Sequence, residues 1–380
     1  MSGLRGPDSS KDAQLLDNAV FPETVDVNIR QLDPIPAPRY FLKEIPLTDE
    51  MSDLVLKSRQ EIRDVLNGKD DRLLAIVGPC SIHDPKAAHE YAAKLAAVKK
   101  ELEDQLVIVM RVYFEKPRTT IGWKGLINDP DLDGQFNIRK GMWLARKVLA
   151  DVLSLGLPAA TEWLDPITPQ YICDLISWGA IGARNTESQV HRELASGMSM
   201  PIGFKNATDG SIKPAADSCF AAAFEHHFLS INLDGRVISA ETKGNPDCHL
   251  VLRGSSHGPN YDTDSVAKAL ADLKVSKASG PSEHGLVIDA AHGNCGKDEV
   301  REAEVIENIA SRIATGESGI SGIMMESFLK AGNQKPAPLD QLEYGKSITD
   351  AACRGNVPNS CCTRLPMQSK AVAHSPNKRK

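Results

Sequence analysis

The chain has 380 residues, of which 41% are hydrophobic and 25% are charged, and its formal net charge is −6. This composition excludes fibrous and disordered classes, and the acidic balance argues against a nucleic-acid partner, because such proteins carry a basic excess. No apolar run reaches the roughly 18 residues of a membrane span, and the polar residues 1–14 lack a signal segment. The eight cysteines form no CxxC pair, which favours reduced thiols. We therefore expect a cytoplasmic protein that binds neither membranes nor nucleic acids.

The first 45 residues predict an arm rather than part of a packed core. Their periodicity is weak, and the proline-rich stretch 33–38 favours an extended polyproline conformation. Apolar residues at helical spacing then predict a helix over 49–67 that ends at Gly68. We place the main domain at residues 46–351.

Eight short apolar runs follow, and segments with helical periodicity separate most of them. This alternation predicts parallel strands with right-handed crossovers, and eight such strands predict a (β/α)8 barrel. A helix over 85–102, which has a proline near its start, fits the first crossover. The runs are 73–77, 106–110, 157–160, 180–183, 201–204, 249–252, 286–288 and 322–325.

Three segments depart from this regular alternation. Residues 114–135 form a long loop rich in Gly, Pro and Asp, and such loops are often functional. Residues 226–246 predict an added β-hairpin, because two strand-like runs flank Asp234-Gly235. Residues 352–380 contain no amphipathic helix, so we expect a divergent, disordered tail and a missing or very short eighth helix.

Each predicted strand ends close to a charged or metal-capable residue. The carboxyl ends of the strands carry the active sites of such barrels, so we expect these side chains to share one rim. The cations among them, with Lys116 and Arg118, predict that this acidic protein binds a small, phosphorylated anion there. The eight residues are Cys80, Arg111, Glu162, Arg184, Lys205, Arg253, His292 and Glu326.

The rim also offers a candidate metal site made of Cys80, His292, Glu326 and Asp350. Sulfur, nitrogen and oxygen donors together suit Mn, Fe, Co or Zn better than Mg. The spacing matches no local metal motif, and any one of these residues alone is more often structural. Only their shared position at strand ends favours a divalent metal ion.

Lys205 has two possible roles at the end of its strand. A desolvated lysine could form a Schiff base with a carbonyl substrate, as in barrel aldolases. With Arg184 and Arg253 nearby, it could equally anchor an anion through its charge. The sequence pattern leaves both roles open.

Several long strings resemble the 3-deoxy-D-arabino-heptulosonate 7-phosphate (DAHP) synthase family, in its feedback-regulated microbial and fungal type. The resemblance covers about residues 28–351 and implies an enzyme that condenses phosphoenolpyruvate with erythrose 4-phosphate at the entry to the shikimate pathway. The strings include GPCSIHD at 78–84, GAIGAR at 179–184, GFKN at 203–206 and YGKSITD at 344–350.

The resemblance also implies a role for each rim residue. Cys80, His292, Glu326 and Asp350 would ligate the divalent metal. Phosphoenolpyruvate would be held by Arg111, Arg184, Lys205 and Arg253, which makes Lys205 an anchor. Lys116 would face the aldehyde oxygen, Arg118 and Thr119 would hold the second sugar phosphate, and Glu162 would line the pocket near a water.

The family is inhibited by aromatic amino acids that bind near the added hairpin and neighbouring subunits. The resemblance therefore implies a homo-oligomer, a dimer or tetramer. It also implies an effector site. Ser230 in this site favours phenylalanine over tyrosine as the effector. The matching positions are Pro169, Gln170, Ser199, Phe228 and Ser230.

Two departures from the family pattern motivate an alternative. Ala290 and Ala291 precede His292 where the family has an aromatic residue and a serine, and the sequence diverges after Ala351. Losing support around a metal ligand can weaken metal binding about 10- to 100-fold. The alternative is therefore a catalytically weakened paralogue with a binding or regulatory role.

Overall fold

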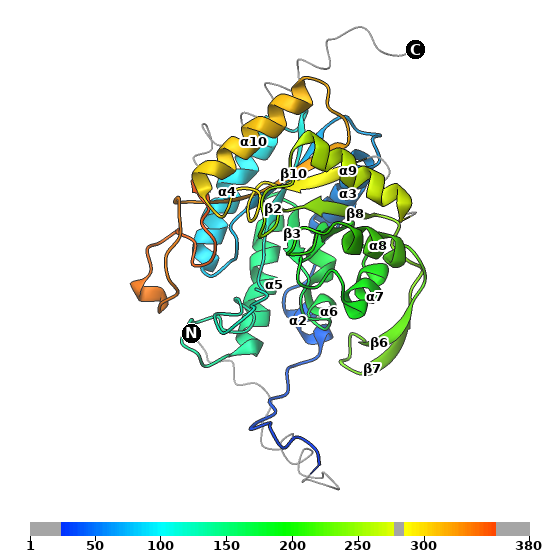
Figure 1. The fold of residues 1–380 in the computed structure, drawn as a ribbon. Coiled ribbons are helices and arrows are strands. Elements are labelled where there is room, and N and C mark those ends of the chain that lie inside the picture. The colour runs from blue at the N-terminus through cyan, green and yellow to red at the C-terminus, as the bar shows by residue number, and fades with distance from the viewer. Residues whose placement is uncertain (1–23, 277–284, 355–380) are drawn as a thin grey trace.

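The computed structural model describes residues 24–276 and 285–354, and its central feature is a closed parallel sheet (Figure 1). The strand order is β1-β2-β3-β4-β5-β8-β9-β10, and β10 pairs with β1 to close the barrel. The predicted (β/α)8 barrel is thereby confirmed. The strands are Leu73–Gly78 (β1), Leu106–Arg111 (β2), Ala159–Glu162 (β3), Trp178–Ile181 (β4), Ile202–Lys205 (β5), Cys248–Leu252 (β8), Leu286–Asp289 (β9) and Ile320–Phe328 (β10).

Helices follow the first seven barrel strands and cover the sheet from outside (Figure 1). Side-chain caps define several of their starts: Asp84 accepts from the amides of Lys86 and Ala87, and Asp298 from those of Val300 and Arg301. These helices are Pro85–Glu101 (α4), Ile138–Ser154 (α5), Pro169–Ile172 (α6) with the 3-10 turn Cys173–Leu175 (η2), Gln189–Gly197 (α7), Lys213–Ala222 (α8), Thr263–Val275 (α9) and Glu299–Ala314 (α10).

Two helices precede the barrel. Asp49–Leu66 (α3) begins at the cap Thr48 and confirms the predicted helix. Pro38–Glu44 (α2) corrects the expectation that the arm stays extended to residue 45: the prolines end at Pro38, which starts the helix, and Phe41 buries its ring edge-on against Tyr171. Residues 1–23 of the predicted arm lie outside the described residues.

The added hairpin is present as two antiparallel strands, His227–Ile231 (β6) and Val237–Glu241 (β7). Gly235 supplies the positive φ that the turn requires, 74°. The turn contacts the arm, because the Arg39 amide donates to the Leu233 carbonyl (2.9 Å) and the Arg39 Nε lies 2.6 Å from Asp234 Oδ1. The hairpin is therefore tied to the segment before the barrel.

The chain after β10 differs from the other repeats. Among the residues described up to 354, β10 is followed by the 3-10 turn Leu339–Gln341 (η4) and by no α-helix. The start of the expected disordered tail is corrected: Ala352 is buried, and Cys353–Arg354 (β11) pairs in parallel with β10. Residues 355–380 of that tail lie outside the described residues.

The core has two layers, one inside the barrel and one between the sheet and its helices. Trp178 fills the barrel interior and stacks obliquely on His249, to which its Nε1 donates (3.1 Å). Gly203 makes room for this indole, since a Cβ there would stand 2.5 Å from it. In the described part of the chain, no helix has the length and apolarity to cross a membrane.

Arg146 joins the outer helices and yields a stability prediction. Its buried guanidinium donates to both Asp174 carboxylate oxygens (2.7 and 2.8 Å) and to the carbonyls of Ile45 and Tyr171. We expect Arg146→Met to lower the free energy of unfolding by about 2–4 kcal/mol, because it leaves buried acceptors unpaired. Urea denaturation measures this change, and Arg139→Met, at an exposed position on the same helix, should change it by less than about 0.5 kcal/mol. Equal effects of the two substitutions would contradict the prediction.

Candidate active site

A cleft opens at the carboxyl ends of the barrel strands and has two adjoining lobes. The inner lobe, about 130 Å³, is lined by residues from six of the eight strand ends and by the segment around Asp350. The outer lobe, about 460 Å³, shares Lys116, Arg118 and Arg184 with the inner lobe and extends over the long loop after β2. The structure thus gathers the predicted rim residues at one place.

Three of the four predicted metal ligands form a tight group. Ligand atoms of Cys80, Glu326 and Asp350 all lie within 4.8 Å of one another. Glu326 Oε2 is buried and has no hydrogen-bond partner in the described chain, so this ligand candidate has an unused acceptor. One sulfur and two carboxylates fit a divalent ion of the transition series.

His292 lies beside this group rather than inside it. Its Nε2 is 3.6 Å from Glu326 Oε1, and its Nδ1 is 3.0 Å from Asp289 Oδ2. A carboxylate behind the other ring nitrogen is the usual support of a metal-binding histidine, although here Nδ1 makes no hydrogen bond of good geometry with any described residue. The imidazole is therefore oriented for a ligand role, with Nε2 towards the group.

Asp289, at the end of β9, connects the metal group with Lys205. The Oδ2 atom of this fully buried side chain also accepts from Lys205 Nζ (3.0 Å). Burial alone would raise the pKa of Asp289, but His292 and Lys205 hold this pKa well below its usual range. The carboxylate is thus a permanent negative charge between two functional groups.

Arg111 lies beneath the inner lobe with no exposed surface. Its Nη2 donates to Glu326 Oε1 (2.9 Å), and its guanidinium stacks 4.1 Å above the Tyr113 ring centre. Burial opposes the charge, but Tyr113, Glu326 and Asp289 hold the pKa of Arg111 above its ordinary value. Nη1 has no partner in the described chain, so one donor is unused.

The half-buried Lys116 and the buried Lys205 present two further cations. The Lys116 ammonium donates to the Cys80 carbonyl (3.0 Å) and to its sulfur (3.2 Å), so it lies against a candidate metal ligand. Burial lowers the pKa of Lys116, but Cys80 and Glu162 outweigh it and the pKa is raised. Lys205 lies between Asp289 and Glu162, whose Oε2 is 3.9 Å away.

The remaining predicted anchors border the cleft: Arg118 and Arg184 line both lobes, and Arg253 lines the inner lobe. Arg184 donates from Nε to the Thr119 hydroxyl (2.9 Å), which brings residues from two loops together. The backbone of Arg253 is fixed because its amide donates to Oδ1 of the buried Asn206 (2.8 Å). Arg118 is held through its Nε by the Trp123 carbonyl (2.8 Å). Each cation thus has a defined position beside the cleft.

Comparisons with known proteins identify the family of this chain. The model of the DAHP synthetase I family matches residues 45–360. The chain belongs to this family. A Phe-sensitive phospho-2-dehydro-3-deoxyheptonate aldolase of Escherichia coli is 51% identical over 326 residues, which cover 86% of this chain and 92% of that protein. A putative phospho-2-dehydro-3-deoxyheptonate aldolase of Schizosaccharomyces pombe is 49% identical, with 87% and 89% covered.

A solved structure gives the same picture for the fold of the DAHP synthase family. The phospho-2-dehydro-3-deoxyheptonate aldolase of Francisella tularensis superposes with a TM-score of 0.87 at 46% identity, covering 90% of this chain and 99% of that one. A Trp-sensitive form from Enterobacter agglomerans is 48% identical over 328 residues. The resemblance inferred from the sequence is confirmed, and both effector types occur among the relatives.

Two buried acids near the cleft of this DAHP synthase family member were not singled out from the sequence. Burial and the nearby Asp165 raise the pKa of Glu115, which lines the outer lobe, to about 8. Glu302, on α10, accepts from the Glu326 amide (2.6 Å), and burial with the Glu326 charge raises its pKa well above the usual range. The helical periodicity around Glu302 gave no sign that it faces the barrel.

The two segments where we expected departures from the family pattern both lie next to metal-ligand candidates. Ala290 and Ala291 are buried, and the Ala291 amide donates to Asp289 Oδ1 (3.1 Å), which fixes this carboxylate from the backbone. Asp350 is held by Lys297 (3.0 Å), and after it the Cys353 thiol donates to the Glu299 carbonyl (3.0 Å). The described chain end is therefore anchored on α10.

Asp289 yields a prediction about metal binding. We expect Asp289→Asn to weaken Mn²⁺ binding about 10- to 100-fold, because the neutral amide supports neither the His292 ring nor the Lys205 ammonium as the carboxylate does. Isothermal titration of the metal-free protein measures the affinity. Asp272→Asn, on α9 away from the cleft, is the control and should bind Mn²⁺ as the wild type does. Unchanged affinity in Asp289→Asn would refute the role given to this carboxylate.

Proposed function

We propose that this chain condenses phosphoenolpyruvate with erythrose 4-phosphate and water to give DAHP and phosphate, the first step of the shikimate pathway. Family membership supports the reaction class, which forms a carbon–carbon bond as in an aldol addition. The observation that carries the proposal is the single cleft in which buried cations adjoin the group of Cys80, Glu326 and Asp350.

Phosphoenolpyruvate is assigned to the inner lobe. Its phosphate and carboxylate together need several cationic donors, and Arg111, Arg184, Lys205 and Arg253 are the proposed anchors. Arg111 supports this assignment, because its unpartnered Nη1 is a buried donor that an anion can satisfy. Lys205 is proposed as an anchor rather than a Schiff-base nucleophile, because its Nζ is engaged in an ion pair with Asp289.

Erythrose 4-phosphate is assigned to the outer lobe. Arg118 and Thr119 are proposed to hold its phosphate, and Lys116 to donate a proton to its aldehyde oxygen as C3 of the enol attacks. The raised pKa of Lys116 supports a donor that is charged at neutral pH. Two phosphorylated substrates repel each other, so fixed cations between the lobes are needed to bring the reacting carbons into contact.

The family implies a divalent metal, and the donors present in this chain fit one. We propose Cys80, His292, Glu326 and Asp350 as ligands and Mn, Fe, Co or Zn as the metal, because a thiolate disfavours Mg. When bound, the ion would supply Lewis acidity to the aldehyde oxygen. Glu162, which is buried near Lys205, is proposed to orient the water that adds at C2.

Feedback inhibition by an aromatic amino acid is a further part of the proposal. Relatives named as Phe-sensitive and Trp-sensitive forms support it. The five proposed effector positions come from three parts of the fold. Pro169 and Gln170 lie on α6, Ser199 follows α7, and Phe228 and Ser230 lie on β6. The Phe228 ring lies near the α7 end, since a Cβ on Gly197 would be 3.9 Å from it.

We propose phenylalanine as the effector. We further propose that the protein assembles as a homodimer or homotetramer and that it is cytoplasmic.

Metal removal tests the reaction directly. We expect exhaustive chelation to lower phosphate release in the presence of both substrates by at least about 100-fold, and Mn²⁺ to restore it, because the ion is needed to polarise the aldehyde. Cys80→Ser should reproduce the loss, whereas Cys173→Ser, on η2, should not. Undiminished turnover after chelation would refute the proposal, and no turnover in the metal-loaded protein would favour the weakened, binding-only paralogue.

The effector assignment has its own test. We expect phenylalanine to inhibit at lower concentration than tyrosine or tryptophan, and Ser230→Gly to weaken phenylalanine inhibition about tenfold, because the pocket loses a hydroxyl contact. Initial rates with each amino acid measure this. Ser239→Gly, at an exposed position on the paired strand β7, is the control. Inhibition that is unchanged in Ser230→Gly would contradict the placement of the site.

A further inference from the structure

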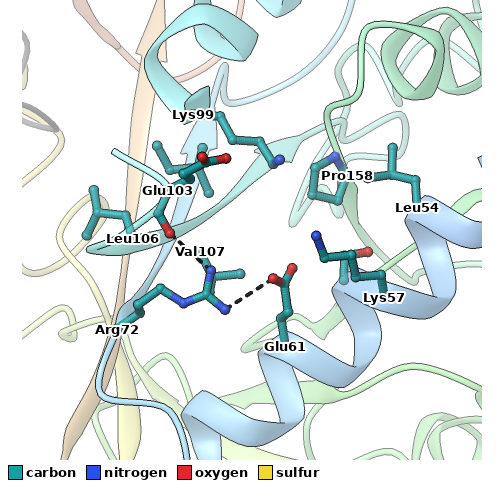
Figure 2. Close-up of a pocket in the computed structure, with 11 residues that line it drawn as sticks. Leu54, Lys57, Glu61, Arg72, Lys99, Glu103, Leu106, Val107 and Pro158 are labelled. Atoms are coloured by element: carbon teal, nitrogen blue, oxygen red, sulfur yellow. Dashed lines mark hydrogen bonds and ion pairs between the residues drawn. The ribbon is translucent and has the colours of Figure 1, made fainter. Parts of the chain in front are cut away.

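A second cavity lies at the opposite end of the barrel from the candidate active site. It holds about 300 Å³ between α3, the end of α4 and the amino-terminal ends of the first three strands (Figure 2). Arg72 precedes β1, Leu106 starts β2 and Pro158 precedes β3, so the cavity opens at the base of the barrel. No substrate anchor or metal-ligand candidate lines it.

Arg72 is fully engaged in this base cavity. Its Nη2 lies 2.6 Å from Asp70 Oδ2 and 3.1 Å from Glu61 Oε1, and its Nη1 donates to the Glu103 carbonyl (3.1 Å). Figure 2 shows this guanidinium bound at one side of the cavity, with Glu61 turned towards it. Arg72 and Glu61 therefore satisfy each other and form part of the wall.

Lys57 and Lys99 are different, because neither ammonium group forms an ion pair or a side-chain hydrogen bond with any residue in ranges 24–276 and 285–354. Lys57 extends from α3 and Lys99 from the last turn of α4, and both side chains reach towards the same opening (Figure 2). The Glu103 side chain also lines the cavity and offsets part of this positive charge. With Arg72 and Glu61 paired to each other, Lys57, Lys99 and Glu103 leave a net positive charge that an anion between the two ammonium groups can satisfy. The cavity thus offers donors from two helices.

The rest of the cavity supplies an apolar surface. Leu54, on α3, and Leu106 and Ile108, on β2, line it together with Pro158. Of these, Leu106, Ile108 and Pro158 are buried parts of the protein core. The cavity surface as a whole is more polar than apolar, because charged side chains from α3, α4 and the segment before β1 also line it. Its volume of about 300 Å³ is at the small end of the range of small-molecule sites.

We propose that the base cavity binds a small organic anion, with one carboxylate or phosphate group between Lys57 and Lys99 and a compact apolar body against Leu54, Leu106 and Pro158. Both headgroups share the oxyanion chemistry that paired ammonium groups recognise. The bound molecule connects α3, α4 and β2, so it stabilises the amino-terminal half of the barrel. The inference does not rest on the proposed reaction.

The test uses phenyl phosphate and benzoate as probes of the two headgroups. Crystals of the full chain soaked in each probe should show it in the base cavity, with its oxyanion at Lys57 and Lys99. Isothermal titration is carried out with phosphoenolpyruvate saturating the active site, so that the base cavity is measured. We expect Lys57→Gln/Lys99→Gln to weaken binding of the preferred probe at least about tenfold, because two charge-assisted contacts are lost.

A matched double variant controls for net charge. Lys69→Gln/Lys100→Gln removes two exposed lysines that do not line the cavity and should bind the probe as the wild type does. Both double variants should keep the wild-type rate of phosphate release. This rate reports on the active site alone, so probe binding in the base cavity is tested independently of the proposed reaction. Equal affinities in the two double variants overturn the proposal, as does density at the active site alone. Density in the base cavity without the tenfold difference in solution means binding at crystal concentration only, and also overturns it.

Discussion

The candidate site depends on one buried carboxylate, that of Asp289. A single oxygen lies 3.0 Å from both Lys205 Nζ and His292 Nδ1, in a place without solvent. The Lys205 ammonium needs this partner, because a buried charge must be paired. The imidazole of His292 faces the same oxygen at ion-pair distance, without the geometry of a hydrogen bond. Because Asp289 ends β9, the barrel itself sets its coordinates.

The other charges of the rim extend from this centre in pairs. Arg111 is matched by Glu326 and by the face of Tyr113, and Lys116 lies against Cys80. In each pair, one member is a proposed substrate contact and the other a proposed metal ligand. Substrate anchors and metal ligands therefore hold each other in place, and the rim is already arranged for charged partners. Such preorganisation lowers the reorganisation needed when they arrive.

The sequence predicted the barrel well because its signals are local. Apolar runs such as 106–110 and 286–288 and the turn at Asp234-Gly235 carry their own periodicity or turn chemistry. The rim residues could be gathered because parallel strands share a carboxyl edge. Glu302 and Asp289 were not assigned roles, since a helical glutamate and a strand-end aspartate look like ordinary polar positions until the tertiary contacts appear. Helix α2 was missed for a similar reason, because Phe41 folds onto Tyr171, which is distant in the chain.

The anchored chain end has a consequence for how this sequence can vary. Asp350 is held by Lys297 and by the Ser347 hydroxyl at its carbonyl, and Ala352 and Cys353 are fastened directly after it. Every described contact that positions this carboxylate is made by residue 353 or earlier. Mutational drift, a changed exon boundary or an altered reading frame beyond that point therefore leaves the described contacts of the rim intact. The family model continues to residue 360, so the match outlasts the last of these described contacts.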